Sequence, residues 1–385
     1  MVNRGFDIAE FEGRLTRCQA RMRDDGFQAL MLCTEADVRY FTGFLTQFWE
    51  SPTRPWFLVI PQSGKPVAVI PEIGLDLMAR CWIDDIRTWR SPDPVDDGIG
   101  LLASTIRECV GATGRLGLPM GPETHLRMPA NDLESLRHGL AGVEIGDCAA
   151  LIRDLRMVKS DAEIVKIDHV CTLVSDVFES GPALFFEGQA EIEAFRDFKI
   201  ACLRAGVDDV RYLVGGAGPG GYGDIISPPT DRPIRAGDVL MLDTGAVFDG
   251  YFCDFDRNFA FAHAADPVRR AYDVVYAATE AGLKMARPGM TCAALFDCMQ
   301  AVLSPHAEET GAVGRLGHGL GMQLTEWPSN VSFDHTELRA GMVITLEPSL
   351  VFAPGRMMVH EENIVIVAGG ARLLSRRAPP EIPIL

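Results

Sequence analysis

The fold is decided by residues 239–261, which read VLMLDTGAVFDGYFCDFDRNFAF. Two apolar runs flank the dipeptide Asp249-Gly250, which is the strongest short-range signal for a β-hairpin with a two-residue turn. Leu, Met and Phe side chains on both sides of this turn indicate strands that are buried on at least one face. The stretch therefore predicts an antiparallel strand pair in the C-terminal half of the chain.

Three carboxylates lie on this strand pair. The turn pairs Asp243 with Asp256 and Gly245 with Asp254, and side chains at alternate positions of a strand share a face. We therefore expect Asp243, Asp254 and Asp256 to project from one face of the sheet. Two like charges ~4 Å apart repel by about 4 kcal/mol at an effective dielectric of about 20. Either some of these groups stay protonated, or a multivalent cation lies among them.

Three further polar residues interrupt apolar or glycine-rich segments later in the chain. His318 lies in a glycine-rich turn, where backbone and ligand can approach closely. Glu347 ends the apolar strand predicted over residues 342–346, and Glu361 interrupts the apolar stretch 357–367. A carboxylate at the centre or end of an apolar strand rarely occurs without a partner. These residues are therefore candidates for the same cation site.

The order of these elements resembles the pita-bread metallopeptidases, a family that includes aminopeptidase P, prolidase, methionine aminopeptidase and the metal-free creatinase. The shared elements are two aspartates separated by ten residues, a histidine in a glycine-rich turn, T-x-E-P and E-x-N-I-V. Residues 38–44 (VRYFTGF) resemble a motif of the family's N-terminal domain, and residues 153–164 (RDLRMVKSDAEI) resemble its interdomain junction. The resemblance thus covers nearly the whole chain.

The resemblance and the local patterns imply an α/β two-domain chain. Residues 1–152 are expected to form an N-terminal creatinase-like α/β domain with a mixed sheet. Residues 153–385 are expected to form a C-terminal pita-bread α+β domain with a curved antiparallel sheet. Residues 160–163 (SDAE) have the capping-box pattern that begins a helix, close to this boundary. Strand-like apolar runs in the N-terminal domain occupy residues 29–32, 56–60 and 66–70.

The resemblance also implies a set of metal ligands and a mechanism. Asp243 would bind one ion, Asp254 and Glu361 would bridge two ions, and His318 and Glu347 would bind the second. A water or hydroxide between the ions would be the nucleophile, and Glu347 would also carry protons. The cofactor is expected to be two divalent ions per chain. Mn²⁺, Fe²⁺ or Co²⁺ suit this oxygen-rich set best, while Zn²⁺ or Mg²⁺ is possible.

Four positions depart from the family pattern. Thr325 and a residue near Ile226 stand where the family carries histidines that contact the substrate or lie near it, and Val359 replaces an arginine. Loss of a donor to a developing oxyanion typically lowers the rate by about 10²–10³. Asp256 replaces a threonine. It is predicted to be catalytic together with the ligands His318 and Glu347, although a sixth ligand or an outer hydrogen-bonding group are alternatives.

Three residues are candidates for substrate contact. Thr325 occupies the position of the missing histidine, and Trp327 either lines the pocket or only packs beside Pro328. Tyr222 lies in a glycine-rich segment, residues 215–223, which is expected to be a flexible loop that caps the site. His360 should face away from the metals, because it alternates with Glu361 along its strand.

Composition limits partners and location. The chain has 36 basic and 53 acidic residues, a net charge of −17, and no visible basic stripe. We therefore expect no nucleic-acid partner and no anionic-membrane partner. Ten cysteines without a CxxC pair, no apolar run of about 18 residues and no apolar signal segment favour the cytoplasm. The resemblance implies a homodimer, with Phe48-Trp49 in a loop that would suit the interface.

Three functions remain open. The leading hypothesis is a dinuclear-metal hydrolase of a C–N bond, resembling Xaa-Pro dipeptidase or aminopeptidase, with a short peptide or small molecule as substrate. The second is a metal-dependent lyase or hydrolase of a small osmolyte, betaine or cyclic amide. The third is a non-catalytic binding module.

Overall fold

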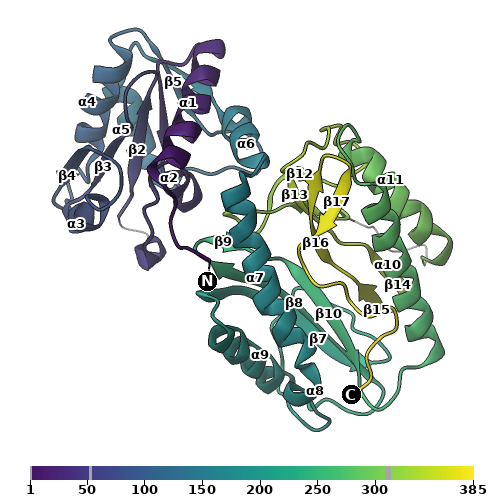
Figure 1. Cartoon of the computed structure of the whole chain (residues 1–385). Helices are drawn as coiled ribbons and strands as arrows, with labels where there is room; N and C mark the ends of the chain where they lie inside the picture. The colour runs from purple at the N-terminus through teal and green to yellow at the C-terminus, as the bar shows by residue number, and fades with distance from the viewer. Residues whose placement is uncertain (1, 52–53, 308–313) are drawn as a thin grey trace. The chain divides into compact units, whose positions relative to one another are not determined.

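The chain divides into two compact units, residues 3–156 and 157–385, by its internal contacts. The computed structural model describes residues 2–51, 54–307 and 314–385 (Figure 1). The division by contacts falls inside helix α6 (Ala149–Met157). The domain limits expected from the sequence, 1–152 and 153–385, stay a prediction.

The N-terminal unit is built on one mixed sheet, as predicted. Its six strands lie in the order β4-β3-β2-β1-β5-β6; β2 pairs antiparallel with β1 and β3, and the remaining pairs are parallel. Alternate side chains of β1 and β2 pack with helix α4 in a core that contains Met31, Val59 and Leu102. The strands are β1 (Ala29–Leu32), β2 (Phe57–Pro61), β3 (Val67–Pro71), β4 (Asp85–Trp89), β5 (Arg115–Leu118) and β6 (Glu144–Asp147). The helices besides α6 are α1 (Ile8–Asp24), α2 (Glu35–Thr42), η1 (Gln47–Glu50), η2 (Glu72–Gly74), α3 (Leu75–Met78), α4 (Ile99–Val110) and α5 (Ala130–Gly139).

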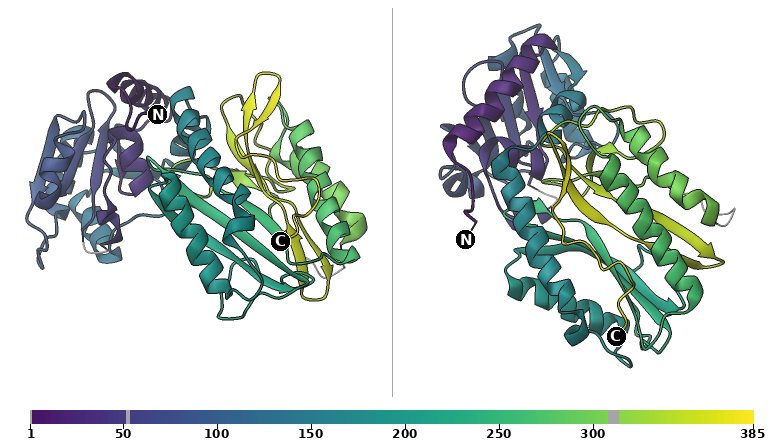
Figure 2. Two further views of the ribbon diagram at one scale, coloured as in Figure 1. Left: turned by 60° about the horizontal axis from the view of Figure 1, so that its bottom comes forward. Right: turned by 45° about the vertical axis from the view of Figure 1, so that its right-hand side comes forward.

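The C-terminal unit contains antiparallel sheets between two groups of helices, as Figure 2 shows. One sheet has the order β10-β8-β7, with β9 paired to β8, and a second has the order β12-β11-β13-β16-β17. Helices α7 and α9 pack against β8 and β7, while α10 packs against β14, β15 and β17. The helices are α7 (Asp161–Glu179), α8 (Gly181–Leu184), α9 (Glu191–Ala205), α10 (Asp266–Met285), α11 (Cys292–Leu303) and η3 (Ser304–His306).

The strands of this unit carry the predicted antiparallel pattern. The first sheet comprises β7 (Asp209–Pro219), β8 (Asp238–Phe248), β9 (Tyr251–Phe252) and β10 (Phe255–Ala260). The second comprises β11 (His318–Gly319), β12 (Glu326–Ser329), β13 (Val343–Leu346), β16 (Glu362–Val367) and β17 (Gly370–Leu373). A separate pair is formed by β14 (Ser349–Ala353) and β15 (Arg356–Val359). The architecture is the two-domain arrangement that the sequence predicts.

The hairpin turn forms as predicted. Asp249 and Gly250 both adopt positive φ angles, 46° and 78°, as a two-residue type I′ turn requires. Phe248 then pairs with Tyr251 across β8 and β9. Lys166 of α7 holds the turn against that helix, because its ammonium group lies 2.6 Å from the buried Asp249 carboxylate.

One predicted pairing in this hairpin is wrong. Asp243 does pair with Asp256, but Gly245 pairs with Tyr212 of β7, and Asp254 lies in the connection between β9 and β10. The register of the hairpin is nevertheless the predicted one on both sides of this point, since Phe248 pairs with Tyr251 and Thr244 with Phe255. Both backbone groups of Asp254 are bound by the side chain of Asn363: the Asp254 N–H donates to Asn363 Oδ1 at 2.9 Å, and Asn363 Nδ2 donates to the Asp254 carbonyl. These bonds link Asp254 to β16.

The glycine-rich segment 215–223 is only in part the loop that its composition predicts, since residues 220–223 lie outside the strands but residues 215–219 do not. Strand β7 continues to Pro219 and pairs with β8 along this length. A Cβ at Gly215 would lie 2.1 Å from the Met241 carbonyl oxygen, so glycine permits this close approach of the two strands. The strand ends where Gly220 and Gly221 adopt positive φ angles.

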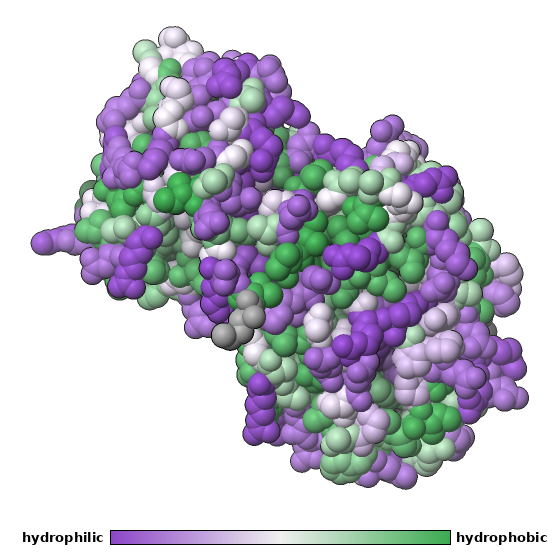
Figure 3. Space-filling model, viewed as in Figure 1, coloured by the Kyte–Doolittle hydropathy of each residue, from purple (hydrophilic) through white to green (hydrophobic). Residues whose placement is uncertain are grey.

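Helix α7 begins with the predicted capping box. The Glu163 N–H donates to Ser160 Oγ, and the Ser160 N–H donates to the Glu163 carboxylate at 2.9 Å. Within the described ranges, no helix is long and apolar enough to cross a membrane. Hydrophilic side chains cover much of each unit on the face drawn in Figure 3.

The Lys166–Asp249 pair gives a test of what holds the hairpin against α7. Replacing Lys166 with alanine leaves the Asp249 carboxylate buried without its cation, and we expect the free energy of unfolding to fall by about 3–5 kcal/mol. The control is Arg372→Ala, which breaks an exposed pair with Asp168 and should change stability by only about 0–1 kcal/mol. Urea unfolding followed by circular dichroism measures both values. Equal effects of the two substitutions would contradict the assignment.

Candidate metal centre

The five predicted ligands come from five different segments of the C-terminal unit. Asp243 lies on β8, and Asp254 lies in the connection between β9 and β10. His318 is the first residue of β11, Glu347 directly follows β13, and Glu361 directly precedes β16. Both sheets therefore contribute to one site.

Three of these side chains meet closely. Asp254, His318 and Glu361 each offer one ligand atom, and these atoms all lie within 4.8 Å of one another. His318 Nε2 lies 3.4 Å from Asp254 Oδ2. All three residues are buried. Asp243 and Glu347 border the same group, because their charges raise the pKa values of both Asp254 and Glu361.

Two buried oxygens of this cluster have no hydrogen-bond donor among the described residues, namely Asp243 Oδ1 and Glu361 Oε1. A buried acceptor without a donor is destabilising, and the great majority of such groups in proteins are paired. A divalent cation satisfies carboxylate oxygens directly and also neutralises their charge. The residues present therefore fit a divalent metal ion.

The electrostatics of the cluster agree with this fit. Burial, and then the neighbouring carboxylates, raise the pKa values of Asp254 and Glu361 well above their ordinary range. Burial raises the pKa of Glu347 to about 8, and burial raises that of Asp243 to about 7 against an opposing hydrogen bond from Tyr212. Without a cation, these carboxyl groups hold protons at pH values where ordinary carboxyl groups are ionised.

His318 is prepared as a metal ligand. Burial lowers its pKa to about 4, so the imidazole is neutral at physiological pH, which is the form that binds metals. Its Nδ1 lies 2.9 Å from the Gly319 carbonyl oxygen. That contact places the ring proton on Nδ1 and leaves Nε2, which faces Asp254, available as a ligand atom.

Sequence reasoning missed two polar residues beside the cluster. The Tyr212 hydroxyl, from β7, donates to the Asp243 carboxylate, and burial and four carboxylates raise the pKa of Tyr212. Arg315 supplies a positive charge that lowers the pKa values of Asp254, Glu347 and His318. The only feature of the sequence that could have indicated Arg315 as part of the site is its position three residues before His318.

Asp256 contacts the cluster through the backbone of Glu361. One of its carboxylate oxygens accepts the Glu361 N–H, and the other accepts Asn258 Nδ2 at 3.0 Å. The Tyr222 hydroxyl donates to Asn258 Oδ1 at 2.9 Å and accepts the Val359 N–H at 2.8 Å. These residues form a fully buried hydrogen-bond network, here called the Glu361 support network.

The three predicted substrate contacts lie in different surroundings. Tyr222 is 3% exposed, and its hydroxyl belongs to the Glu361 support network. Thr325 is partly buried in the bend before β12. Trp327, on β12, is partly buried against the core, and its Nε1 donates to Thr336 Oγ1 at 3.4 Å. Their roles in substrate binding stay predictions.

His360 and Glu362 flank the ligand Glu361 and turn away from it. His360 Nδ1 lies 3.0 Å from Thr279 Oγ1, on the side of α10, as strand alternation predicts. Glu362 forms buried ion pairs with Arg257 and Arg377 at 3.0 and 3.2 Å. Burial alone would raise the pKa of Glu362, but the charge of Arg257 and the hydrogen bonds from Ser375 and Ala378 help to bring it below its ordinary value. Two adjacent glutamates therefore serve opposite sides of the sheet.

The model of metallopeptidase family M24 matches residues 165–368, and that of the creatinase/prolidase N-terminal domain matches residues 14–158. The probable dipeptidase PepE of Mycobacterium tuberculosis is 28% identical over 385 residues, covering 99% of this chain and 98% of its own. The Xaa-Pro dipeptidase of Pyrococcus furiosus is 26% identical, with 94% and 97% of the two chains covered. The crystal structure of dipeptidase PepE from Mycobacterium ulcerans superposes with a TM-score of 0.85, at 28% identity and over 98% of this chain and 99% of that one.

The chain therefore belongs to metallopeptidase family M24, and it is a metallohydrolase with the two-domain, pita-bread architecture of that family. Membership implies divalent metal ions at the catalytic centre, and Asp254, His318 and Glu361 are grouped closely enough to hold one.

The raised carboxyl pKa values predict how pH affects the metal-free protein. A pKa that is higher in the folded state contributes stability that is lost as the pH rises through the folded value. Histidines are neutral above about pH 6.5 in both states, so the loss should dominate between about pH 6.5 and pH 8.5. We expect the thermal unfolding midpoint to fall over this range in EDTA and to stay level with Mn²⁺, which keeps the carboxylates ionised. A constant midpoint in EDTA would contradict a cation-free carboxyl cluster.

Proposed function

We propose that this enzyme is a peptidase that uses two divalent ions to hydrolyse the Xaa-Pro bond of short peptides. The observation that carries the proposal is the pair of buried carboxylate oxygens without donors, on Asp243 and Glu361, beside the neutral imidazole of His318. Similarity to a probable dipeptidase and to an Xaa-Pro dipeptidase over nearly the whole chain supports this substrate class.

We assign the ligands as the resemblance implies. Asp243 would hold one ion, His318 and Glu347 would hold the second, and Asp254 and Glu361 would be shared between them. Four carboxylates and one imidazole favour Mn²⁺, Fe²⁺ or Co²⁺. When bound, the ions supply a Lewis acid and lower the pKa of water at the site.

The proton chemistry belongs to side chains of the chain itself. The resemblance implies that Glu347, besides holding an ion, carries a proton, which it would deliver to the departing amine. The Tyr212 hydroxyl orients Asp243 through its hydrogen bond. Arg315 adds a fixed positive charge near Glu347, which favours anionic groups of a substrate at this edge of the site.

Asp256 acts as a positioning residue in this proposal. Both of its oxygens accept protein donors, so neither is directed at an ion. The contact with the Glu361 N–H fixes the backbone from which the ligand carboxylate extends. We therefore favour the outer hydrogen-bonding alternative over a sixth ligand or an acid/base group.

A second candidate function is a lyase or hydrolase reaction on a small osmolyte, betaine or cyclic amide. The specific observation that favours it is Thr325, which stands where a histidine would contact the scissile carbonyl. Thr325 is short and neutral, and it cannot reproduce a charged imidazole donor.

We further propose a cytoplasmic homodimer. All ten cysteines are free thiols, as expected in a reducing compartment. Phe48, in η1, is 37% exposed and is suited to an interface, whereas its neighbour Trp49 is 8% exposed and packs with Trp56.

The substrate class is tested with enzyme loaded with Mn²⁺ or Co²⁺. Xaa-Pro dipeptides and Xaa-Pro-Yaa tripeptides should be hydrolysed, whereas betaines and cyclic amides should not. Glu361→Gln should lower both metal affinity and turnover by more than about 100-fold, while Glu134→Gln, on the exposed surface, should change neither. Metal binding with turnover only of the non-peptide panel would overturn the peptidase proposal in favour of the second candidate.

The role of Asp256 is tested by two substitutions. Asp256→Thr removes the acceptors for the Glu361 N–H and for Asn258, and we expect metal affinity to weaken by about 10–100-fold together with turnover. Asp256→Asn retains one acceptor and should restore part of the affinity. Isothermal titration with Mn²⁺ and turnover at saturating metal separate the possibilities. Collapsed turnover with unchanged metal affinity would instead identify Asp256 as a catalytic acid or base.

A further inference from the structure

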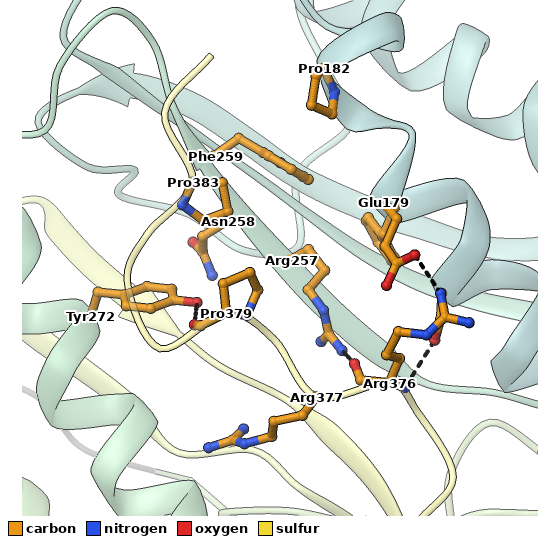
Figure 4. Close-up of a pocket in the computed structure, with 12 residues that line it drawn as sticks. Glu179, Pro182, Arg257, Asn258, Phe259, Tyr272, Arg376, Arg377, Pro379 and Pro383 are labelled. Atoms are coloured by element: carbon orange, nitrogen blue, oxygen red, sulfur yellow. Dashed lines mark hydrogen bonds and ion pairs between the residues drawn. The ribbon is translucent and has the colours of Figure 1, made fainter.

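A cavity lies beside β10, and Asn258 of the Glu361 support network is part of its lining. It has a volume of about 260 Å³ and is bounded by α7, α8, β10, α10 and the C-terminal segment 376–383 (Figure 4). In the part of the chain that the structure describes, its lining includes none of the five proposed metal ligands. Drug-sized ligands occupy pockets of roughly 300 Å³ or more, so this cavity suits a smaller molecule.

The walls of the cavity are largely hydrocarbon rings. Phe178 and Phe259 contribute aromatic surface, and Pro182, Pro379 and Pro383 contribute pyrrolidine surface. The C-terminal segment is fixed in place as a wall, because the Ala260 N–H donates to the Pro383 carbonyl at 2.8 Å. Such a surface accommodates an apolar side chain.

The mouth of the cavity presents two opposite charges side by side. Arg376 Nη1 lies 2.7 Å from Glu179 Oε2, and their side chains are 44% and 61% exposed. Asp176 contacts the other terminal nitrogen of Arg376 at 2.8 Å. Exposed ion pairs contribute little to stability, so these groups can exchange partners readily. A guanidinium group can bind a ligand carboxylate through two hydrogen bonds, and Glu179 can accept an ammonium group.

The lining is mainly apolar surface, although Arg257, Arg377 and Asn258 also belong to it, and it includes the exposed Arg376–Glu179 ion pair. This combination matches one class of molecule. We propose that this cavity binds a free apolar α-amino acid, with its carboxylate on Arg376, its ammonium group on Glu179 and its side chain against Phe178 and Phe259. Figure 4 shows Arg376 and Glu179 joined by their ion pair, with Phe259 and Pro182 among the other lining residues. The link to catalysis rests on the proposed function, since a peptidase releases amino acids.

Arg257 connects this cavity to the metal centre. It lines the cavity, and its Nη1 donates to the Glu361 carbonyl oxygen at 3.1 Å. Its Nη2 donates to the Arg376 carbonyl oxygen. One buried guanidinium group therefore holds the backbone of a metal ligand and the backbone of the proposed amino-acid site. A ligand that shifts Arg376 would change the constraint on Glu361.

Calorimetric titration of the metal-loaded enzyme with L-phenylalanine tests the site. We expect binding at millimolar concentration, weakened by about tenfold or more in Arg376→Ala. The matched control Arg372→Ala removes an exposed arginine outside the cavity and should leave binding unchanged. The deamino analogue 3-phenylpropanoate should be sensitive to Arg376→Ala but indifferent to Glu179→Gln, whereas L-phenylalanine should lose affinity in both.

The outcomes separate this site from the metal centre and from the proposed function. Binding of L-phenylalanine that is unchanged in Arg376→Ala, or absent in the unsubstituted enzyme, would overturn the proposal. The titration needs no turnover, so it is decisive even if peptides are not hydrolysed. Where peptides are hydrolysed, we expect L-phenylalanine to alter kcat in a manner that Arg376→Ala abolishes. Purely competitive inhibition that persists in this variant would overturn the link through Arg257.

Discussion

The C-terminal unit depends on one electrostatic constraint, which is that four carboxylates buried around a common centre must be neutralised. Burial raises the pKa values of Asp243, Asp254, Glu347 and Glu361, and neighbouring carboxylates raise those of Asp254, Glu347 and Glu361 further. Protonation satisfies this constraint only in part, because Asp243 Oδ1 and Glu361 Oε1 still lack donors among the described residues. Divalent cations satisfy both the charge and the orphaned oxygens.

The ligands are held mainly through their backbones rather than through their carboxylates. Asn363 binds both backbone groups of Asp254, Asp256 accepts the Glu361 N–H, and Arg257 donates to the Glu361 carbonyl. This arrangement leaves the carboxylate oxygens available for metal while fixing the positions from which they extend. It also explains why so many polar residues on β10 and β16 are fully buried: Arg257, Asn258 and Asn363 are the donors that this backbone scaffold requires.

The sequence predicted features that depend on local chemistry. The Asp249-Gly250 turn fixes the register of Asp243 with Asp256, because positive φ angles at both turn residues are encoded in the dipeptide itself. The link of Asp254 to Asn363 was not predictable from the hairpin, since Asn363 lies 109 residues further along the chain. Tyr212 could not be predicted as a neighbour of the site, because a single tyrosine on a half-buried strand belongs to no sequence motif that indicates its partner. Residues 215–219 were misjudged as a loop because glycines that allow strands to approach closely have the same composition as a flexible loop.

The departures from the family pattern differ in what they imply for the substrate. Val359 contributes only backbone groups at this point, since its N–H donates to the Tyr222 hydroxyl and its carbonyl accepts Asn258 Nδ2 at 2.7 Å. Asp256 then obtains its donors from Asn258 and from Glu361. The residues of the Glu361 support network therefore satisfy one another's hydrogen bonds. The departures at Asp256 and Val359 belong to this network and concern the position of Glu361, and they do not by themselves change the groups that a substrate would contact. Thr325 and the segment near Ile226 are the departures that the resemblance links to substrate contact. The choice between a peptide and a non-peptide substrate therefore depends on which hydrogen-bond donors replace the two histidines. Arg315 is a described cation whose charge lowers the pKa values of Asp254, Glu347 and His318, so it lies near the side of the site where such donors would act.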